Sequence, residues 1–284
     1  MSARPRPPSN PPDVRRATPS PADPLQEQGG LEEAWRARLL AAPSDAAFRE
    51  AYDAIHIAMR RRPGRERLYE TALTRVDRAF LKALAGARRI LDLGAGNGRF
   101  ALAAAPGRRV VALEISREAL AAMQAHGVSP IGLTACQASA LRLPFRAEAF
   151  DAVVSLDLVE HLHPDHLGEH LGEVHRVLIP GGRYLLHTPS ALHGPTSLGL
   201  HLREYRLREV MEVARAVGFL PRWMCLNLAR FGWIGTAPGW LWPLLLAWES
   251  IWDEAGRAGL RRPGGRWYAA GVPDVDLELR KPRR

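Results

Sequence analysis

An apolar run followed by a turn with glycine at every second position constrains the fold of this chain most. The stretch ILDLGAGNGRF covers residues 90–100, with an aspartate in the apolar run and glycines at Gly94, Gly96 and Gly98. Glycine lets a backbone adopt positive φ and approach a ligand closely. The apolar run predicts a buried strand, and the ALAAA that follows the turn predicts the start of a helix.

From this turn onward the sequence alternates between strand and helix patterns. Strands are expected at RRVVALEIS, PIGLTACQA, FDAVVSLDL, GRYLLHTP and RWMCLNLA, with a further one at DVDLELRKP. Helices are expected at SREALAAMQAHG, HLGEHLGEVHRVL and LREVMEVARAVGF. This alternation predicts βαβ units, and therefore an α/β fold with a mostly parallel sheet and helices on both faces. In such sheets a ligand binds at the carboxyl ends of the strands, beside the first strand.

The rest of the chain divides by composition. Residues 1–30 are rich in proline, serine and charge, and are expected to form a disordered tail without the apolar core of a secretory signal. Residues 31–86 show a helical period and predict two or three helices that cap the site. Residues 87–284 form the main domain, with a tryptophan-rich helical insertion at about 230–272.

The net charge is +9, from 39 Lys and Arg residues against 30 Asp and Glu residues. Such a balance can indicate nucleic acid or an anionic membrane as the partner. Nearly all the basic residues are arginines spread along the chain, without a dense basic block interleaved with aromatic residues, so the sequence disfavours nucleic acid. The only two cysteines, Cys136 and Cys225, lie far apart, which suits a cytoplasmic protein and excludes a disulfide scaffold.

The acidic residues around the glycine turn distinguish between two nucleotide ligands. A dinucleotide-binding turn has the spacing G-x-G-x-x-G, but its third glycine position is occupied here by Arg99. Asp92 precedes the turn, and its negative charge disfavours a pyrophosphate and favours a cationic amino group. Glu114 ends the next strand, 22 residues later, where a carboxylate can accept hydrogen bonds from both hydroxyls of a ribose. An amino-acid end and a ribose together describe S-adenosylmethionine.

At these residues the chain resembles the class I S-adenosylmethionine-dependent methyltransferases. The resemblance runs from about Arg88 to Phe219 and includes ALRLPF, FDAVVSLDLVEHL, EVHRVLIPGGRYLLHTPS and HLREYRLREVMEVARAVGF in the family's order. It is most similar to the small-molecule group that contains the ubiquinone-biosynthesis O-methyltransferases. The resemblance implies a Rossmann-like sheet of seven strands, mostly parallel, whose last strand is antiparallel.

The resemblance also implies the cofactor contacts. The turn would surround the methionine part, Glu114 and Ile115 would hold the ribose, and Leu156 would lie at the end of the fourth strand. Many relatives have an aspartate where this chain has Ser139, whose hydroxyl could meet the adenine amino group through a weaker, uncharged hydrogen bond. The full set of implied cofactor residues is Asp92, Gly94, Ala95, Gly96, Gly98, Glu114, Ile115, Ser139, Ala140 and Leu156.

The segment DLVEHLHPDH supplies candidate catalytic groups. The resemblance implies Glu160 or His161 as a base, with His201, at the start of a lid helix, as a second candidate. A positioned base typically contributes about 10²–10⁴-fold to a rate. Asp157, Glu160 and His161 also match a pattern that implies a magnesium-type ion in ubiquinone-type enzymes. The same Glu-His pair without a metal, and a structural role, remain open alternatives.

The other histidines of the central region are expected to have no metal role. His166 and His170 stand four residues apart in an expected helix, among polar residues. We expect this to be a solvated helix face and not a zinc site. His187 ends the fifth strand and is expected at the same edge of the sheet as the candidate catalytic groups.

The sequence predicts methyl transfer from S-adenosylmethionine to a small-molecule acceptor by direct displacement with a base. An RNA or protein methyltransferase and a non-catalytic, methyltransferase-like interaction module are the alternatives. The stretch FGWIGTAPGWLWPLLLAWESIW, residues 231–252, carries five of the eight tryptophans. It fits the lid of an apolar or lipid-binding pocket or a peripheral membrane contact, or else an insertion packed on the core or on a second subunit. The oligomeric state stays open.

Overall fold

A computed structural model describes residues 24–60, 73–125, 131–193, 200–224 and 274–283, together with the single residues 244, 247 and 251. The strands are β1 Arg89–Leu93, β2 Arg109–Glu114, β3 Leu133–Gln137, β4 Phe150–Leu156, β5 Leu178–Thr188, β6 Leu220–Trp223 and β7 Val275–Arg280. The α-helices are α1 Pro24–Ala41, α2 Asp45–Arg60, α3 Arg75–Ala83, α4 Arg99–Ala104, α5 Arg117–Ala125, α6 Leu167–Val177 and α7 Leu207–Val217.

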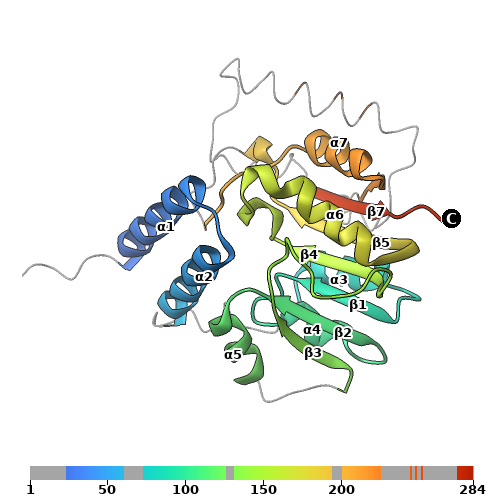
Figure 1. Cartoon of the computed structure of the whole chain (residues 1–284), viewed down its shortest axis with the longest axis horizontal. Coiled ribbons are helices and arrows are strands. Elements are labelled where there is room, and N and C mark those ends of the chain that lie inside the picture. The colour runs from blue at the N-terminus through green and yellow to red at the C-terminus, as the bar shows by residue number, and fades with distance from the viewer. Residues whose placement is uncertain are drawn as a thin grey trace, which may run out of the picture.

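The seven strands form one sheet in the order β3-β2-β1-β4-β5-β7-β6, with helices packed around it (Figure 1). The pairs β1–β2, β1–β4, β2–β3 and β4–β5 are parallel, whereas β7 runs antiparallel to both β5 and β6. The predicted Rossmann-like, mostly parallel sheet of seven strands with an antiparallel last strand is therefore confirmed. Because β1 to β5 are parallel, their carboxyl ends meet at one edge of the sheet.

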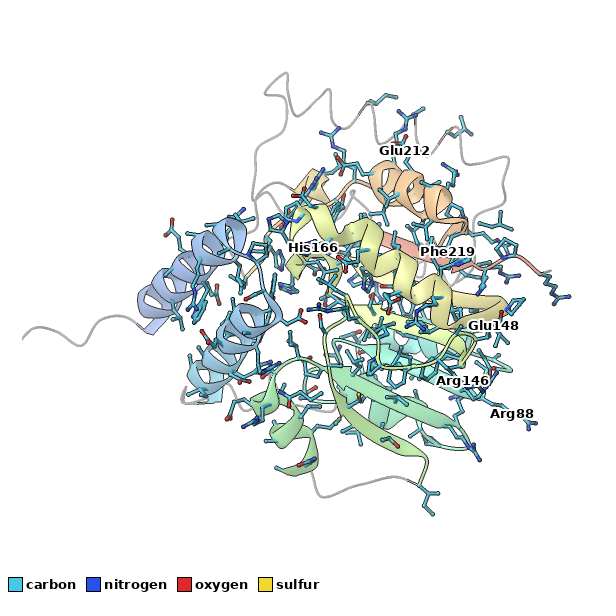
Figure 2. The ribbon with its side chains drawn as sticks, viewed as in Figure 1. Arg88, Arg146, Glu148, His166, Glu212 and Phe219 are labelled. Carbon is cyan, nitrogen blue, oxygen red and sulfur yellow. The ribbon has the colours of Figure 1, made fainter. Side chains whose placement is uncertain are left out.

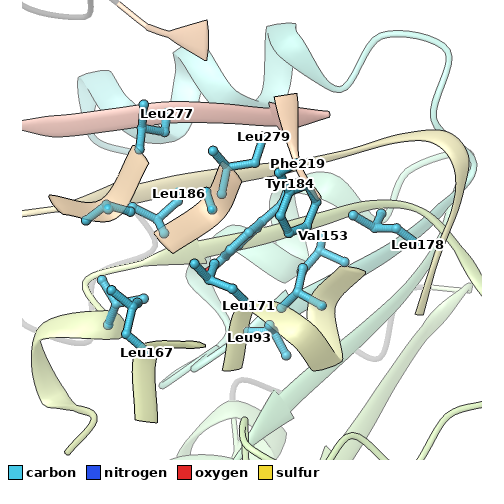
Figure 3. Close-up of a cluster of buried hydrophobic side chains, with 14 of the residues drawn as sticks. Leu93, Val153, Leu167, Leu171, Leu178, Tyr184, Leu186, Phe219, Leu277 and Leu279 are labelled. Atoms are coloured by element: carbon cyan, nitrogen blue, oxygen red, sulfur yellow. The ribbon is translucent and has the colours of Figure 1, made fainter. Parts of the chain in front are cut away.

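Two apolar layers cover the two faces of the sheet. In the layer of Figure 3, Leu93 of β1 packs with Tyr184 of β5 and with side chains of α6 and α7. Ile90, on the opposite face of β1, belongs to the second layer, together with side chains of α3 and α4. Since side chains alternate along a strand, Asp92 shares the face of Ile90. The carboxylate of β1 therefore lies on the side of α3 and α4.

Two of the helices before the sheet, α2 and α3, lie in different places. Helix α3 begins with a capping box, in which the Thr74 hydroxyl accepts from the Asp77 amide and Asp77 accepts from the Thr74 amide. This helix packs in the second apolar layer. Helix α2 instead lies at the carboxyl edge, beside α5 (Figure 1). Its Asp53 accepts from the Ser116 hydroxyl at 2.7 Å and from the Glu118 amide at 3.2 Å, which ties α2 to the start of α5.

Several boundaries differ from those expected from the sequence. Pro24–Gly30 form the first turns of α1, so the expected tail is wrong in its last residues, because a proline at the first helical position and the Gln and Glu that follow favour a helix. Strand β6 begins before the expected RWMCLNLA. Strand β5 begins at Leu178, before the expected GRYLLHTP, and includes the Pro-Gly-Gly stretch.

The tryptophan-rich insertion lies outside the described residues, except for Leu244, Ala247 and Ile251. These three are helical and exposed, with Leu244 and Ile251 each 62% exposed. Among the described residues, no helix is long and apolar enough to cross a membrane.

Candidate functional site

The glycine turn between β1 and α4 opens onto a cavity. The amides of Gly94 and Ala95 both donate to the Leu113 carbonyl of β2, at 2.9 and 3.0 Å, which holds the turn against the neighbouring strand. Gly96 has φ +53°, and a Cβ atom added there would meet no atom within 4 Å. Its missing side chain therefore leaves open space on the cavity side, where a ligand can approach the backbone.

Gly98 has a different role from Gly96. It caps α4 with φ +80°, and a Cβ atom there would lie 2.4 Å from the side chain of Met123 in α5. Gly98 does not line the cavity. Close packing between α4 and α5 accounts for this glycine, so the third glycine of the motif shapes the site without facing it.

Glu114, at the end of β2, is held by backbone amides. One carboxylate oxygen accepts from the Gly96 amide at 2.9 Å, and the other accepts from Ile115 at 2.7 Å and Ser116 at 2.9 Å. Burial raises the pKa of Glu114, and these hydrogen bonds partly oppose the rise. A carboxylate has about four acceptor positions. One position therefore remains for a ligand hydroxyl in the cavity that Glu114 lines.

Asp92 is the least satisfied polar group at the turn. Its side chain is 2% exposed, and its Oδ2 atom has no hydrogen-bond partner among the described residues. Burial, followed by the charges of Asp77 and Glu114, raises the pKa of Asp92 to about 8, although Arg99 opposes the shift. Arg99 is already paired with Asp77 at 3.1 Å. At neutral pH the free protein therefore keeps Asp92 largely protonated, and a cationic ligand group would favour its ionised form.

The cavity itself lies between α2 and the carboxyl ends of the strands. Its lining combines backbone of the turn, apolar side chains and a few polar groups. The Tyr52 hydroxyl, on α2, is buried without a partner among the described residues. The lining residues are Asp45, Phe48, Tyr52, His56, Gly94, Gly96, Leu113, Glu114, Ile115, Ser139, Ala140, Leu141, Asp157, Leu158, His161 and Leu162.

Six of the ten expected cofactor residues line this cavity and four do not. Gly94, Gly96, Glu114, Ile115, Ser139 and Ala140 are in the lining, whereas Asp92, Ala95, Gly98 and Leu156 are not. Leu158, two residues beyond Leu156, lines it instead. The hydroxyl of Ser139 accepts from the Leu141 amide at 3.3 Å and also bonds Asp45.

The three expected catalytic side chains gather beside the cavity. Ligand-type atoms of Glu160, His161 and His201 lie within 4.8 Å of one another. The His161 and His201 rings are edge to face at 4.9 Å, and His161 also lines the cavity. His161 Nδ1 lies 2.7 Å from the Leu200 carbonyl, which can only accept, so Nδ1 carries the proton and Nε2 keeps its lone pair. Burial lowers the pKa of His161, which favours this neutral form.

Glu160 is the carboxylate of the same cluster. It is fully buried, and one of its oxygens accepts from the Thr188 hydroxyl at 2.8 Å. The other oxygen has no partner among the described residues. Burial and the charge of Asp157 raise the pKa of Glu160 to about 7, so this carboxyl can take up or lose a proton near neutral pH.

The expected magnesium set does not fit this geometry. Asp157 is not part of the group, because its carboxylate lies 3.4 Å from His187 Nε2. The group that forms instead has two imidazoles and one carboxylate. Magnesium prefers oxygen ligands and octahedral geometry. The donor set of Glu160, His161 and His201 thus disfavours the magnesium-type ion, and no catalytic step is assigned to one.

A second polar network beside the cavity was not expected from the sequence. His187 Nδ1 donates to Asp276 at 2.6 Å, across the β5–β7 pair in which these two residues stand opposite. Burial disfavours the charged ring, but the hydrogen bond and charge of Asp276, helped by Asp157, raise the pKa of His187 to about 9. Asp157 has φ +55°, and its amide donates to the His187 carbonyl. The position of His187 at the strand end was the only sequence signal for this network.

The expected solvated face of α6 is wrong for His170. Its ring is fully buried, with Nδ1 3.0 Å from the Ala140 carbonyl and Nε2 2.9 Å from the Tyr184 hydroxyl. Burial lowers the pKa of His170 to about 4. His166, at the start of α6 (Figure 2), instead lies beside His163, with ring centroids 5.2 Å apart. The two histidines of the pair thus have separate surroundings, and His170 positions the Ala140 segment.

Comparisons with known proteins find similarity to methyltransferases. A family model described as "Methyltransferase domain" matches residues 91–186. Over 123 residues the chain is 37% identical to the "Ubiquinone/menaquinone biosynthesis C-methyltransferase UbiE" of Syntrophotalea carbinolica, covering 42% of this chain and 51% of that protein. It is 32% identical over 121 residues to a tRNA (carboxymethyluridine(34)-5-O)-methyltransferase of Arabidopsis thaliana, covering 42% of this chain and 28% of that protein. The chain thus spans about half the length of the first relative and less of the second.

Solved structures show the same fold. The 1,6-didemethyltoxoflavin-N1-methyltransferase of Burkholderia thailandensis has a TM-score of 0.54 at 22% identity, covering 84% of this chain and 88% of that one. The [4+2]-cyclase SpnF has a TM-score of 0.50 at 20% identity, covering 73% of this chain and 82% of that one. Such likenesses show the fold alone. Residues 91–186 therefore match the methyltransferase-domain family model, and the chain shares its Rossmann-like fold with these solved structures.

We expect Asp92→Asn to stabilise the ligand-free protein at neutral pH. The folded-state pKa of about 8 lies above the ordinary value of 3.8, so Asp92 lowers the free energy of unfolding as pH rises from about 4 to about 8. Asparagine removes this loss, with an expected gain of roughly 1–3 kcal/mol at pH 7.5. Urea unfolding of both proteins at pH 5 and pH 7.5 measures it.

The matched control is Asp165→Asn, since that carboxylate is 87% exposed and should leave stability unchanged at both pH values. A stability difference between wild type and Asp92→Asn that stays constant from pH 5 to pH 7.5 would contradict the prediction.

Proposed function

We propose that the protein transfers a methyl group from S-adenosylmethionine to a small-molecule acceptor. The observation that carries this proposal is the buried carboxyl of Asp92, whose Oδ2 atom has no partner among the described residues, beneath a turn whose Gly96 backbone faces an open cavity. Asp92 would neutralise the amino group of the cofactor, and Glu114 would accept from its ribose. The sulfonium of the bound cofactor supplies an already electrophilic methyl group. The protein then has to orient the acceptor, exclude water and remove a proton.

His161 is the proposed base. Its Nδ1 proton is held by the Leu200 carbonyl, so Nε2 can accept a proton from an acceptor hydroxyl, amine or acidic carbon in the cavity. His201, in edge contact with His161 and bonded to Glu204 at 3.0 Å, is the second candidate base. Glu160 would stabilise the imidazolium that forms, because its carboxylate lies in the same cluster.

A small-molecule acceptor is favoured over RNA by the position of the basic residues. The curated relatives include both a quinone-biosynthesis enzyme and a tRNA methyltransferase by name. In the described part of the chain, Arg88, Arg89, Arg108 and Arg109 cluster at the amino ends of β1 and β2. That end of the sheet, where Figure 2 labels Arg88, is opposite to the cavity. An RNA held there would not reach His161.

We expect S-adenosylhomocysteine, the demethylated product, to bind and NAD not to bind. Gly96→Val should weaken binding about a hundredfold or more, because the new side chain fills the space beside the turn. Gly107→Val is the matched control: Gly107 also has positive φ, at +72°, and open space around it, but lies outside the cavity. Calorimetry measures each affinity. NAD binding without S-adenosylhomocysteine binding would refute the cofactor assignment.

We expect His161→Ala to lower kcat by about 10²–10⁴-fold while the affinity for S-adenosylhomocysteine stays within a few fold. Since the pKa of His161 is lowered below the ordinary imidazole value, the wild-type rate should fall with acid only at a pH below the one at which an ordinary histidine is protonated. Labelled S-adenosylmethionine with a metabolite extract identifies the acceptor for this assay. His201→Ala and the double variant are measured alongside. Unchanged kcat in all three variants would exclude both histidines as the base.

The proposed acceptor is apolar or lipid-linked, and residues 231–252 would contact it or a membrane surface. Apolar lining residues such as Phe48, Leu141 and Leu162 favour such an acceptor. Leu244 and Ile251, each helical and seven residues apart in sequence, are exposed. We expect flotation with anionic vesicles that is lost in Leu244→Glu/Ile251→Glu and kept in Leu220→Glu, an equally apolar exposed site of β6. Absence of wild-type flotation, with unchanged tryptophan emission, would exclude the membrane contact.

A further inference from the structure

The first residue of α2, Asp45, brings a carboxylate to the far end of the cavity. Ser44 caps this helix, because its hydroxyl accepts from the Ala47 amide at 3.2 Å, so the Asp45 side chain is not used as the cap. Asp45 instead pairs with Arg142 at 2.6 Å and bonds the hydroxyl of Ser139. It lines the same cavity as Ser139, Ala140 and Leu141.

The sheet order determines which part of a nucleoside would meet this carboxylate. Strands β1, β2 and β3 are successive neighbours in the sheet. Asp92 lies near the carboxyl end of β1, and Glu114 lies at the carboxyl end of β2. Glu114 in turn stands opposite Gln137, at the end of β3. A ligand with its amino-acid end at the glycine turn and its ribose at Glu114 therefore extends its base toward residues 139–141 and Asp45.

The base of S-adenosylmethionine is adenine, whose 6-amino group donates hydrogen bonds and needs an acceptor. The Ser139 hydroxyl accepts from the Leu141 amide and donates to Asp45, which leaves it one uncharged acceptor position. A hydroxyl has one donor and two acceptor positions, whereas a carboxylate has about four acceptor positions. Arg142 and Ser139 occupy two of those on Asp45, so acceptor capacity remains. A charged acceptor also binds an amino group about twice as strongly as a neutral one.

Asp45 is ionised at neutral pH. Burial would raise the pKa of Asp45, but hydrogen bonds from Arg142 and Ser139, with the charges of Arg142 and Arg49, hold that pKa below its ordinary value. Asp151 and Asp53, in contrast, accept hydrogen bonds from backbone amides. Asp45 has no such backbone partner among the hydrogen bonds of the described residues.

We propose that Asp45, as the charged and stronger acceptor, recognises the adenine 6-amino group in place of the neutral hydroxyl of Ser139. The inference rests on the proposed function, since it requires the adenosyl cofactor in this cavity. It makes nucleoside selection depend on α2, a helix outside the parallel sheet. A purely structural Asp45 would only tether α2 to the segment after β3.

Calorimetry with two ligands separates these roles. S-adenosylhomocysteine presents a 6-amino donor, whereas S-inosylhomocysteine presents a 6-oxo acceptor at the same position. We expect the wild type to prefer the adenosyl ligand by about ten- to hundredfold, and Asp45→Asn to lose that preference. In Asp45→Ala/Ser139→Asp the carboxylate is moved to the neighbouring position, and the preference should return.

Arg142→Gln is the control, because it removes the tether and keeps the Asp45 carboxylate. It should weaken both ligands alike and preserve the preference. If Asp45→Asn weakens both ligands equally with an unchanged preference, Asp45 is a tether and the inference is wrong while the cofactor assignment stands. If the folded wild type binds neither ligand, the proposed function and this inference fail together.

Discussion

The buried carboxylate of Asp92 is the constraint on which this site depends. Its Oδ2 atom has no partner among the described residues, and burial, together with the nearby acids Asp77 and Glu114, raises its pKa to about 8. Ionising this buried carboxyl without a cationic partner is costly, so the free protein keeps it largely protonated at neutral pH, whereas a ligand cation would stabilise the carboxylate. The neighbouring features serve the same end: Gly96 leaves the space open, and Glu114 is fixed by the Gly96 amide at 2.9 Å. The ligand-free fold therefore retains a cost that binding removes.

Much of this arrangement could be predicted from the sequence. Alternating strand and helix patterns determined the parallel sheet, because each pattern has its own period and parallel strands need crossover helices. The glycine turn and the acids at the ends of β1 and β2 followed from the same logic, since the carboxyl ends of parallel strands share an edge. The gathering of Glu160, His161 and His201 was expected only through the family resemblance, because His201 is forty residues from His161 in sequence.

The remaining features depend on tertiary packing that no local pattern encodes. The His187–Asp276 pair needs the register between β5 and β7, across 89 residues of sequence. The Asp45–Arg142 pair needs α2 to dock over the segment after β3, across 97 residues. The prediction of a solvated His170 failed because polar neighbours in sequence do not reveal that Tyr184 and Ala140 offer hydrogen bonds in the core. In each case the hydrogen-bond partner of a polar side chain lies on a different element of the fold, at a sequence distance that a local pattern does not cover.

The ionisation of Asp92 with and without ligand tests the account most directly. Carbon-13 NMR of the aspartate carboxyl carbons, assigned through Asp92→Asn, gives the pKa in each state. We expect a pKa of about 8 in the free protein and a pKa below 6 with saturating S-adenosylhomocysteine, because the ligand amino group stabilises the carboxylate. Binding at pH 7 should then release a proton, seen as a dependence of the calorimetric heat on the buffer. A carboxyl of Asp92 that stays protonated at pH 7 in the complex would contradict the central role given to it here.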